Sequence, residues 1–122
     1  MASPSTYRAV RAGAALLLVA AALRHAALAV GGDGDVARHW VFVPINAGLA
    51  ALLVLRPRLA FWPAIALSIQ QMASHGLALS RSFLGTVPLD WASLAVCLFF
   101  PTLVTILFIE RQDDDAETSP DA

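Results

Sequence analysis

The chemistry open to this chain lies in a few polar side chains that interrupt long apolar segments. The densest group is the stretch SIQQMASH, residues 68–75. An imidazole can carry a proton near neutral pH or bind a metal ion or haem, and an amide both donates and accepts hydrogen bonds. We therefore expect a binding site for a small ligand, formed by His25, Asn46, Gln70, Gln71, Ser74 and His75.

Each of these side chains also has a structural interpretation. Hydrogen bonds between neighbouring helices would satisfy the amides and the serine, and such bonds average about 0.6 kcal/mol in membrane proteins. His25 and His75 offer a further alternative, because two imidazoles on different helices could hold a haem or a metal ion between them. No Glu-x-x-His or His-x-x-x-His repeat accompanies them. The ligand-binding hypothesis therefore includes no metal site and specifies no cofactor.

Patterns typical of catalysis are missing from the sequence. No serine has an evident base, no close pair of carboxylates suits acid and base catalysis, and no glycine-rich loop could cradle a phosphate. We therefore assign no catalytic residue. The sequence favours a binding or structural role over an enzymatic one.

The composition indicates a membrane environment. Hydrophobic residues make up 58% and charged residues 14% of the 122 residues, against about 45–50% and about 25% in soluble domains. The net charge is -1, so no strong basic field would attract nucleic acid. The single cysteine, Cys97, excludes an intramolecular disulfide and is typical of a small buried hydrophobe. The lipid bilayer is therefore the expected partner, and nucleic acid is excluded.

Four apolar segments must position the polar groups, at about residues 12–30, 40–55, 59–79 and 91–109. A helix needs about 20 residues to cross a bilayer core, within a range of about 17–25. Only the sequence RPR separates the second segment from the third, and its proline favours a tight antiparallel turn. We expect an all-α integral membrane four-helix bundle with up-down-up-down topology, formed by residues 1–110.

The orientation follows from the arginines, because cytoplasmic loops carry an excess of positive charge. With four spans, the side that holds both termini and the second turn collects Arg8, Arg11, Arg56, Arg58 and Arg111, whereas the other side has Arg24, Arg38 and Arg81. Both termini are therefore expected in the cytoplasm of a multi-pass protein of a cell membrane, with the bacterial inner membrane as the expected location. Residues 111–122 are acidic and polar and predict a disordered tail.

The polar residues fall at similar depths in the outer half of the membrane. His25 and Asn46 each lie about 8–9 Å from the outer end of their helix, and His75 lies at a comparable depth on the third helix. Charged residues gather at the same rim, where we expect structural roles. Arg24 would form an ion pair or reach the interface, Arg38 would lie at the surface, Asp90 would cap the last helix, and His39 would lie at the aqueous rim.

The fate of the first apolar segment stays open. It could be a cleaved signal peptide, because a basic start precedes it and an Ala-x-Ala pattern follows it, although Arg24 and His25 are unusual before a cleavage site.

The function of the polar cluster also stays open. The cluster either binds a lipid-like or quinone-like ligand or only maintains helix packing in an accessory subunit. An accessory subunit would have a further copy of the chain or a larger membrane complex as its partner.

Overall fold

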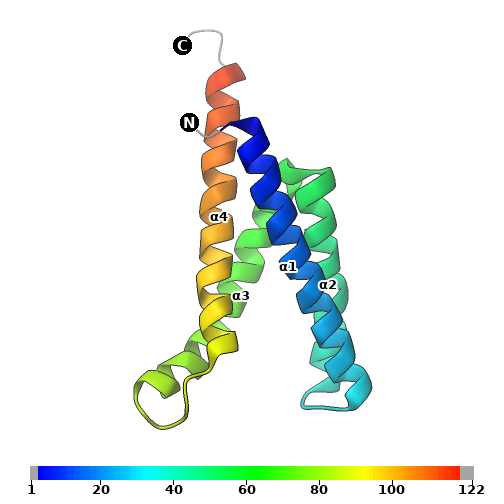
Figure 1. The fold of residues 1–122 in the computed structure, drawn as a ribbon, viewed down its shortest axis with the longest axis vertical. Helices are drawn as coiled ribbons and strands as arrows, with labels where there is room; N and C mark the ends of the chain where they lie inside the picture. Colours follow the sequence, from blue (N-terminus) through cyan, green and yellow to red (C-terminus); the bar gives the residue numbers. More distant parts are fainter. Residues whose placement is uncertain (1–2, 119–122) are drawn as a thin grey trace. The chain divides into compact units, whose positions relative to one another are not determined.

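The computed structural model describes residues 3–118, which form four helices: α1 (Pro4–Gly31), α2 (Val36–Leu55), α3 (Pro57–Phe83) and α4 (Trp91–Thr118) (Figure 1). No strand occurs among the described residues. The prediction of an all-α chain with four helices is confirmed. The chain divides into two compact units, Met1–Ala60 and Phe61–Ala122, so that α3 begins in the first unit and continues in the second. The packing of all four helices in one bundle stays a prediction.

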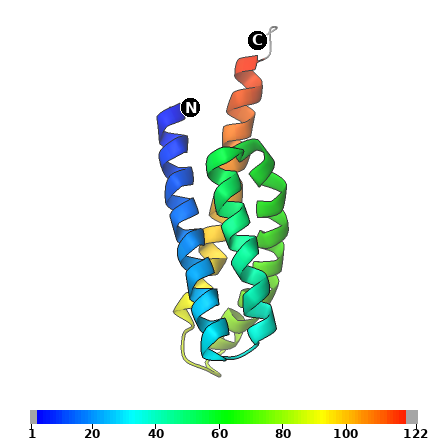
Figure 2. The same cartoon turned by 90° about the vertical axis from the view of Figure 1, so that its right-hand side faces the viewer.

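In the first unit, α1 and α2 form an antiparallel hairpin (Figure 2). The side chain of Ser3 accepts a hydrogen bond from the backbone N–H of Thr6 and caps the start of α1. Gly32 ends α1 with a φ of 75°, a left-handed conformation that costs glycine little. Asp35 then starts α2 by accepting a hydrogen bond from the N–H of Arg38 at 3.0 Å. This short connection brings the first turn of α2 beside the last turns of α1.

Small and medium apolar residues are buried in this hairpin at helical spacing. Leu18 and Leu53 are 1% and 0% exposed, and Leu49 is 3% exposed. Alanines occupy most of the other buried positions, and small side chains allow helix backbones to approach closely. These alanines are Ala14, Ala15, Ala22, Ala29 and Ala50.

In the second unit, α3 and α4 also run antiparallel (Figure 1). The hydroxyl of Ser82 stabilises the loop between α3 and α4. It donates to the carbonyl of Pro88 at 3.0 Å and accepts from the N–H of Asp90 at 3.4 Å. At the other end of the hairpin the ring of Phe61 stacks against that of Phe108, with 6.4 Å between the ring centroids. The connection therefore holds Asp90 at the start of α4.

Three of the helices are long and apolar enough to cross a membrane: α1, α2 and the part of α4 from Trp91 to Ala116. With 27 residues, α3 is long enough to cross as well. Among the described residues, however, it does not reach the same apolarity, because polar side chains interrupt it over residues 68–75. A crossing by α3 as the third of four spans stays a prediction.

The end of α4 differs from the sequence-based expectation. A disordered tail is predicted for residues 111–122, whereas α4 continues as a helix to Thr118. Residues 110–117 contain glutamate, arginine, glutamine and alanine, which favour helix, and Pro120 is the next residue that would interrupt it. The remainder of the predicted tail, residues 119–122, lies outside the described residues.

Candidate functional site

A continuous chain of hydrogen bonds in the second unit links the α3–α4 connection to α3. The hydroxyl of Ser93, in the first turn of α4, donates to Oδ2 of Asp90 at 2.6 Å. The Oγ atom of Ser93 also lies 2.9 Å from Nδ1 of His75 on α3. Asp90 also accepts a hydrogen bond from the backbone N–H of Ser93 at 3.1 Å, which is the contact expected of a helix N-cap. Ser93, at the centre of the chain, is only 1% exposed.

This arrangement determines which nitrogen of His75 carries a proton. A serine hydroxyl has one hydrogen, and that of Ser93 is donated to Asp90, because a carboxylate can only accept. The remaining contact of Ser93 therefore requires His75 to donate from Nδ1. His75 is thus either the neutral Nδ1–H tautomer or the imidazolium. Asp90 orients the imidazole through an intervening serine.

The same hydrogen bonds lower the pKa of Asp90, which lies just before α4 and is half-buried. The largest cause is the hydrogen bond from the Ser93 hydroxyl, followed by that from the Ser93 backbone N–H. Burial opposes them by raising the pKa, and the nearby charge of His75 lowers it slightly. Asp90 therefore keeps its charge under mildly acidic conditions and continues to accept from Ser93.

Gln71 lies one turn before His75 on α3, so the two side chains share one face of the helix. The residue is 5% exposed, and its Oε1 has no hydrogen-bond partner. Ser68, three residues earlier on the same face, is 8% exposed. An unpaired buried polar group costs about 1–3 kcal/mol. The Oε1 atom is therefore a buried acceptor that a hydrogen-bond donor would stabilise.

The other two polar residues of this stretch are placed differently. Gln70 is exposed, and Ser74 is half-buried. The hydroxyl of Ser74 is 3.1 Å from the carbonyl oxygen of Gln70 and 3.3 Å from that of Gln71, so it is satisfied by the backbone of its own helix. Of the four residues predicted on α3, only Gln71 is buried, and His75 on the same face is half-buried.

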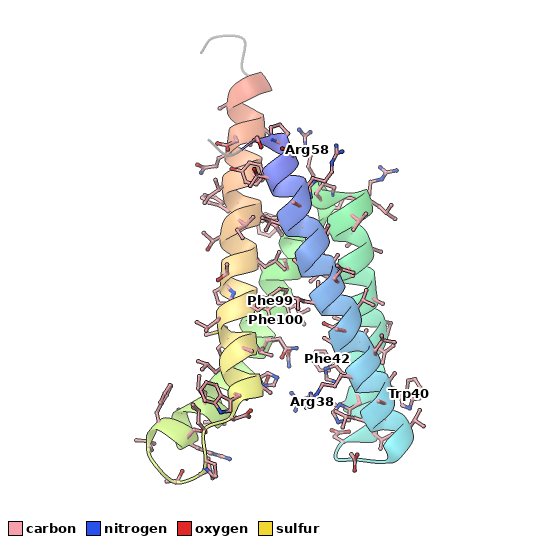
Figure 3. The ribbon with its side chains drawn as sticks, in the orientation of Figure 1. Arg38, Trp40, Phe42, Arg58, Phe99 and Phe100 are labelled. Atoms are coloured by element: carbon pink, nitrogen blue, oxygen red, sulfur yellow. The ribbon has the colours of Figure 1, made fainter. Side chains whose placement is uncertain are left out.

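In the first unit, two histidines meet near the connection between α1 and α2. Nδ1 of His25 lies 2.9 Å from Nδ1 of His39, with 5.1 Å between the ring centroids. The ring of His25 also stacks on Phe42 at a centroid distance of 5.3 Å. The guanidinium of Arg38 lies 5.7 Å from the centre of the same phenylalanine, and Trp40 points away from both (Figure 3).

Asn46 is buried in α2, with 2% of its surface exposed. Its Nδ2 donates to the carbonyl of Phe42 at 2.9 Å, one turn earlier in the same helix. The amide hydrogen bond is therefore made within α2. Arg24, predicted at the membrane rim, is exposed on α1.

The predicted ligand-binding residues are thus distributed over both units. His25 and Asn46 belong to the first unit and the residues 70–75 to the second, and their meeting in one layer stays a prediction. Sequence reasoning gave no role to His39, whose partner lies 14 residues earlier across a loop. Ser93, which links Asp90 to His75, was also absent from the predicted ligand-binding residues.

The described residues offer limited means of holding a metal ion. Within residues 3–118, no group of three or more His, Cys, Asp or Glu side chains is placed to hold one. The haem alternative joins His25 and His75 from separate units and stays a prediction. Comparisons with protein families, with curated proteins and with solved structures find no match to this chain.

Proposed function

We propose that this chain is an integral protein of a cell membrane, with four spans and cytoplasmic termini, that binds the polar end of a small lipid-like or quinone-like molecule. The binding face is formed by Gln71 and His75 on α3. The ligand chemistry that suits this face is a hydroxyl group, as carried by a quinol or a glycerol-based headgroup. Several independent features support the proposal.

The exposure pattern of α3 supports its insertion in a membrane. The polar residues Ser68 and Gln71 are 8% and 5% exposed, whereas Ile69 and Leu77 are 67% and 59% exposed. A helix on the surface of a soluble protein turns its polar side chains to water, whereas α3 buries these two beside apolar residues such as Leu67. Polar side chains in a membrane helix face the protein interior, and apolar ones face lipid. The low apolarity of α3 is therefore compatible with a span.

The tryptophans and arginines support the position and orientation of the spans. Trp40, Trp62 and Trp91 are 50%, 65% and 71% exposed, and each lies near an end of its helix. Indole rings at helix ends are typical of the interface between lipid and water. The arginine excess on the side of the termini favours a cytoplasmic location for both.

The observation that carries the proposal is the unpaired Oε1 of the buried Gln71. Buried polar groups in proteins almost always have a partner, so an exception needs an explanation. A ligand hydroxyl would donate to this oxygen. The neighbouring imidazole of His75 is held in orientation by Ser93 and adds a second polar group one turn away. The amide is neutral, so the ligand would be oriented without the burial of a net charge at Gln71.

The substitution Gln71→Met tests this role, because methionine fills a similar volume without a polar atom. The purified full-length protein would be heated in detergent with a short-chain quinol, its quinone, phosphatidylglycerol or no addition. The wild type is expected to be stabilised by one of them, by about 2.7 kcal/mol at a hundredfold excess over the dissociation constant. Gln71→Met should remove this stabilisation and leave the ligand-free protein at least as stable, because an unpaired polar group is lost.

Gln70→Met is the matched control, since Gln70 is the adjacent residue and is exposed. It should keep the ligand-dependent stabilisation. The proposal fails if no compound stabilises the wild type, or if Gln71→Met weakens the ligand-free protein without a change in the ligand response. The second result would assign Gln71 to helix packing.

The runner-up function is that of an accessory subunit whose polar residues only maintain helix packing. Asn46 and Ser74 favour it, because each makes its hydrogen bonds with the backbone of its own helix. Native mass spectrometry of the detergent-solubilised protein separates the two functions. A bound small molecule lost on Gln71→Met supports ligand binding, whereas a ligand-free chain in a homo-oligomer or in complex with one other protein supports the accessory role.

A further inference from the structure

The contact between His25 and His39 joins two bases. Their Nδ1 atoms are 2.9 Å apart, and both residues are half-buried at the end of the α1–α2 hairpin. A hydrogen bond at this distance requires a proton on one Nδ1 and a lone pair on the other. If both nitrogens lacked the proton, two lone pairs would face each other. The pair therefore shares one proton between its two Nδ1 atoms.

The spacing of the two nitrogens also fits a metal ion. A bond from an imidazole nitrogen to Zn²⁺ is about 2.0–2.1 Å long. For bonds of that length, two nitrogens at adjacent corners of a square lie about 2.9 Å apart, and two at corners of a tetrahedron lie about 3.3 Å apart. The observed 2.9 Å is an ordinary hydrogen-bond distance that also equals the square spacing, so a metal ion could replace the shared proton with little change in the separation of the two nitrogens. Among divalent metals, Cu²⁺ prefers this geometry and binds nitrogen ligands most strongly.

The surroundings hold the two histidines side by side. His25 stacks on Phe42 at a centroid distance of 5.3 Å, which fixes one ring from α1 against α2. His39 is anchored by the first turn of α2, which Asp35 caps through the N–H of Arg38. A modest tilt of each ring would turn both lone pairs from each other toward a common ion. The two ligands thus come from rigid helices rather than from the loop.

We propose that His25 and His39 form a two-imidazole site for a divalent transition metal ion of square-planar preference, foremost Cu²⁺. The metal replaces the proton shared by the two Nδ1 atoms, and each ring then carries its proton on Nε2. Since no third His, Cys, Asp or Glu among residues 3–118 completes a metal-binding group, water fills the other positions. The site is open and exchangeable, and it is independent of the ligand face on α3.

The test uses the full-length protein in detergent, purified without a histidine tag and titrated with Cu²⁺. Electron paramagnetic resonance at one equivalent should give a tetragonal Cu²⁺ spectrum with splitting from two nitrogens. His25→Asn and His39→Asn should each lose that pattern and weaken Cu²⁺ binding by at least about tenfold. Loss of an outer-shell partner already weakens metal binding by about that much, and these two residues are proposed as direct ligands. His75→Asn removes the third histidine and should keep the pattern.

Circular dichroism of each variant establishes that its helices are retained, and His25→Gln and His39→Gln provide a second pair if an asparagine variant fails to fold. The same titration with Zn²⁺ should give weaker binding, in keeping with the observed nitrogen spacing. The proposal is overturned if the wild type takes up no stoichiometric Cu²⁺, or if the two variants bind it as the wild type does. Equal loss in His75→Asn would likewise overturn it, because the pair would then not be the site.

Discussion

The two helical hairpins each hold a histidine against the neighbouring helix, but the partners differ in kind. In the α3–α4 hairpin, His75 faces the hydroxyl of Ser93, which in turn donates to the carboxylate of Asp90. In the α1–α2 hairpin, His25 faces a second imidazole, that of His39. The same side chain is thus connected to an acid in one unit and to a base in the other.

This difference decides the protonation of each imidazole. The carboxylate of Asp90 fixes the direction of every hydrogen bond behind it, so His75 must carry a proton on Nδ1. Between His25 and His39 either ring can be the donor, because the two nitrogens are chemically equivalent. We therefore expect one histidine with a fixed role in the second unit, and a pair with an exchangeable proton in the first.

The largest expected effect comes from breaking the chain at Ser93. Ser93→Ala removes the hydroxyl and leaves Asp90 and His75 each without this partner. Because the serine is 1% exposed, water cannot easily replace it, and the free energy of unfolding should fall by about 1–3 kcal/mol. Reversible unfolding in mixed detergent micelles would measure this loss.

Ser74→Ala is the matched control, because the hydroxyl of Ser74 donates to backbone carbonyls of its own helix, α3. Its effect should stay within about 0.5 kcal/mol. Equal losses in the two variants would mean that the hydrogen-bonded chain adds nothing to the stability of the α3–α4 hairpin.

The sequence predicts the helices well because apolar length and proline position act locally. The separation of α2 from α3 by Arg56 alone follows from Pro57, which favours a helix start. The end of α4 was predicted less well, because the acidic segment after residue 110 suggested disorder. Average polarity cannot distinguish a solvated helix from a disordered tail, since both expose polar side chains.

The arrangement of the candidate site can be read from the sequence only in part. Helical spacing puts Gln71 and His75 on one face of α3, where Gln71 is buried and His75 half-buried, and their role in ligand binding stays a prediction. The contact of His25 with His39 could not be read from spacing, because it depends on how the loop between α1 and α2 sets the two helices. A local pattern reveals the face of one helix, whereas a contact across a loop requires the folded geometry.

The next effect in size is a dependence on pH that arises from Asp90. Its pKa in the folded protein is lowered mainly by the hydrogen bond from Ser93, below the usual value of about 3.9. A lowered pKa contributes stability that is present above the unfolded value and is lost as pH falls through the folded value. The wild type should therefore lose stability below about pH 4.

Asp90→Asn should remove this part of the pH dependence and keep the helix cap, because asparagine caps helices about as well as aspartate. At neutral pH the variant should be less stable by about 0.5–1.5 kcal/mol, since one charge-assisted hydrogen bond is lost. Unfolding measured from about pH 6 to about pH 2.5 gives the difference between variant and wild type. A constant difference over that range would contradict the assigned role of Asp90.

The smallest effect on stability is expected from the contact between His25 and His39 in the first unit. Its energy can be compared directly with that of the contact between His75 and Ser93. A double-mutant cycle with His25→Leu and His39→Leu, measured at about pH 8 where unperturbed imidazole is neutral, isolates the energy of the contact. A hydrogen bond between two neutral rings should contribute about 0.5–1 kcal/mol.

The corresponding cycle with His75→Leu and Ser93→Ala should give a larger coupling, because the carboxylate of Asp90 polarises that chain of hydrogen bonds. If the His25 cycle gives the larger energy, then the contact between two bases is already strong without a bridging metal, and the contrast between the two hairpins does not hold.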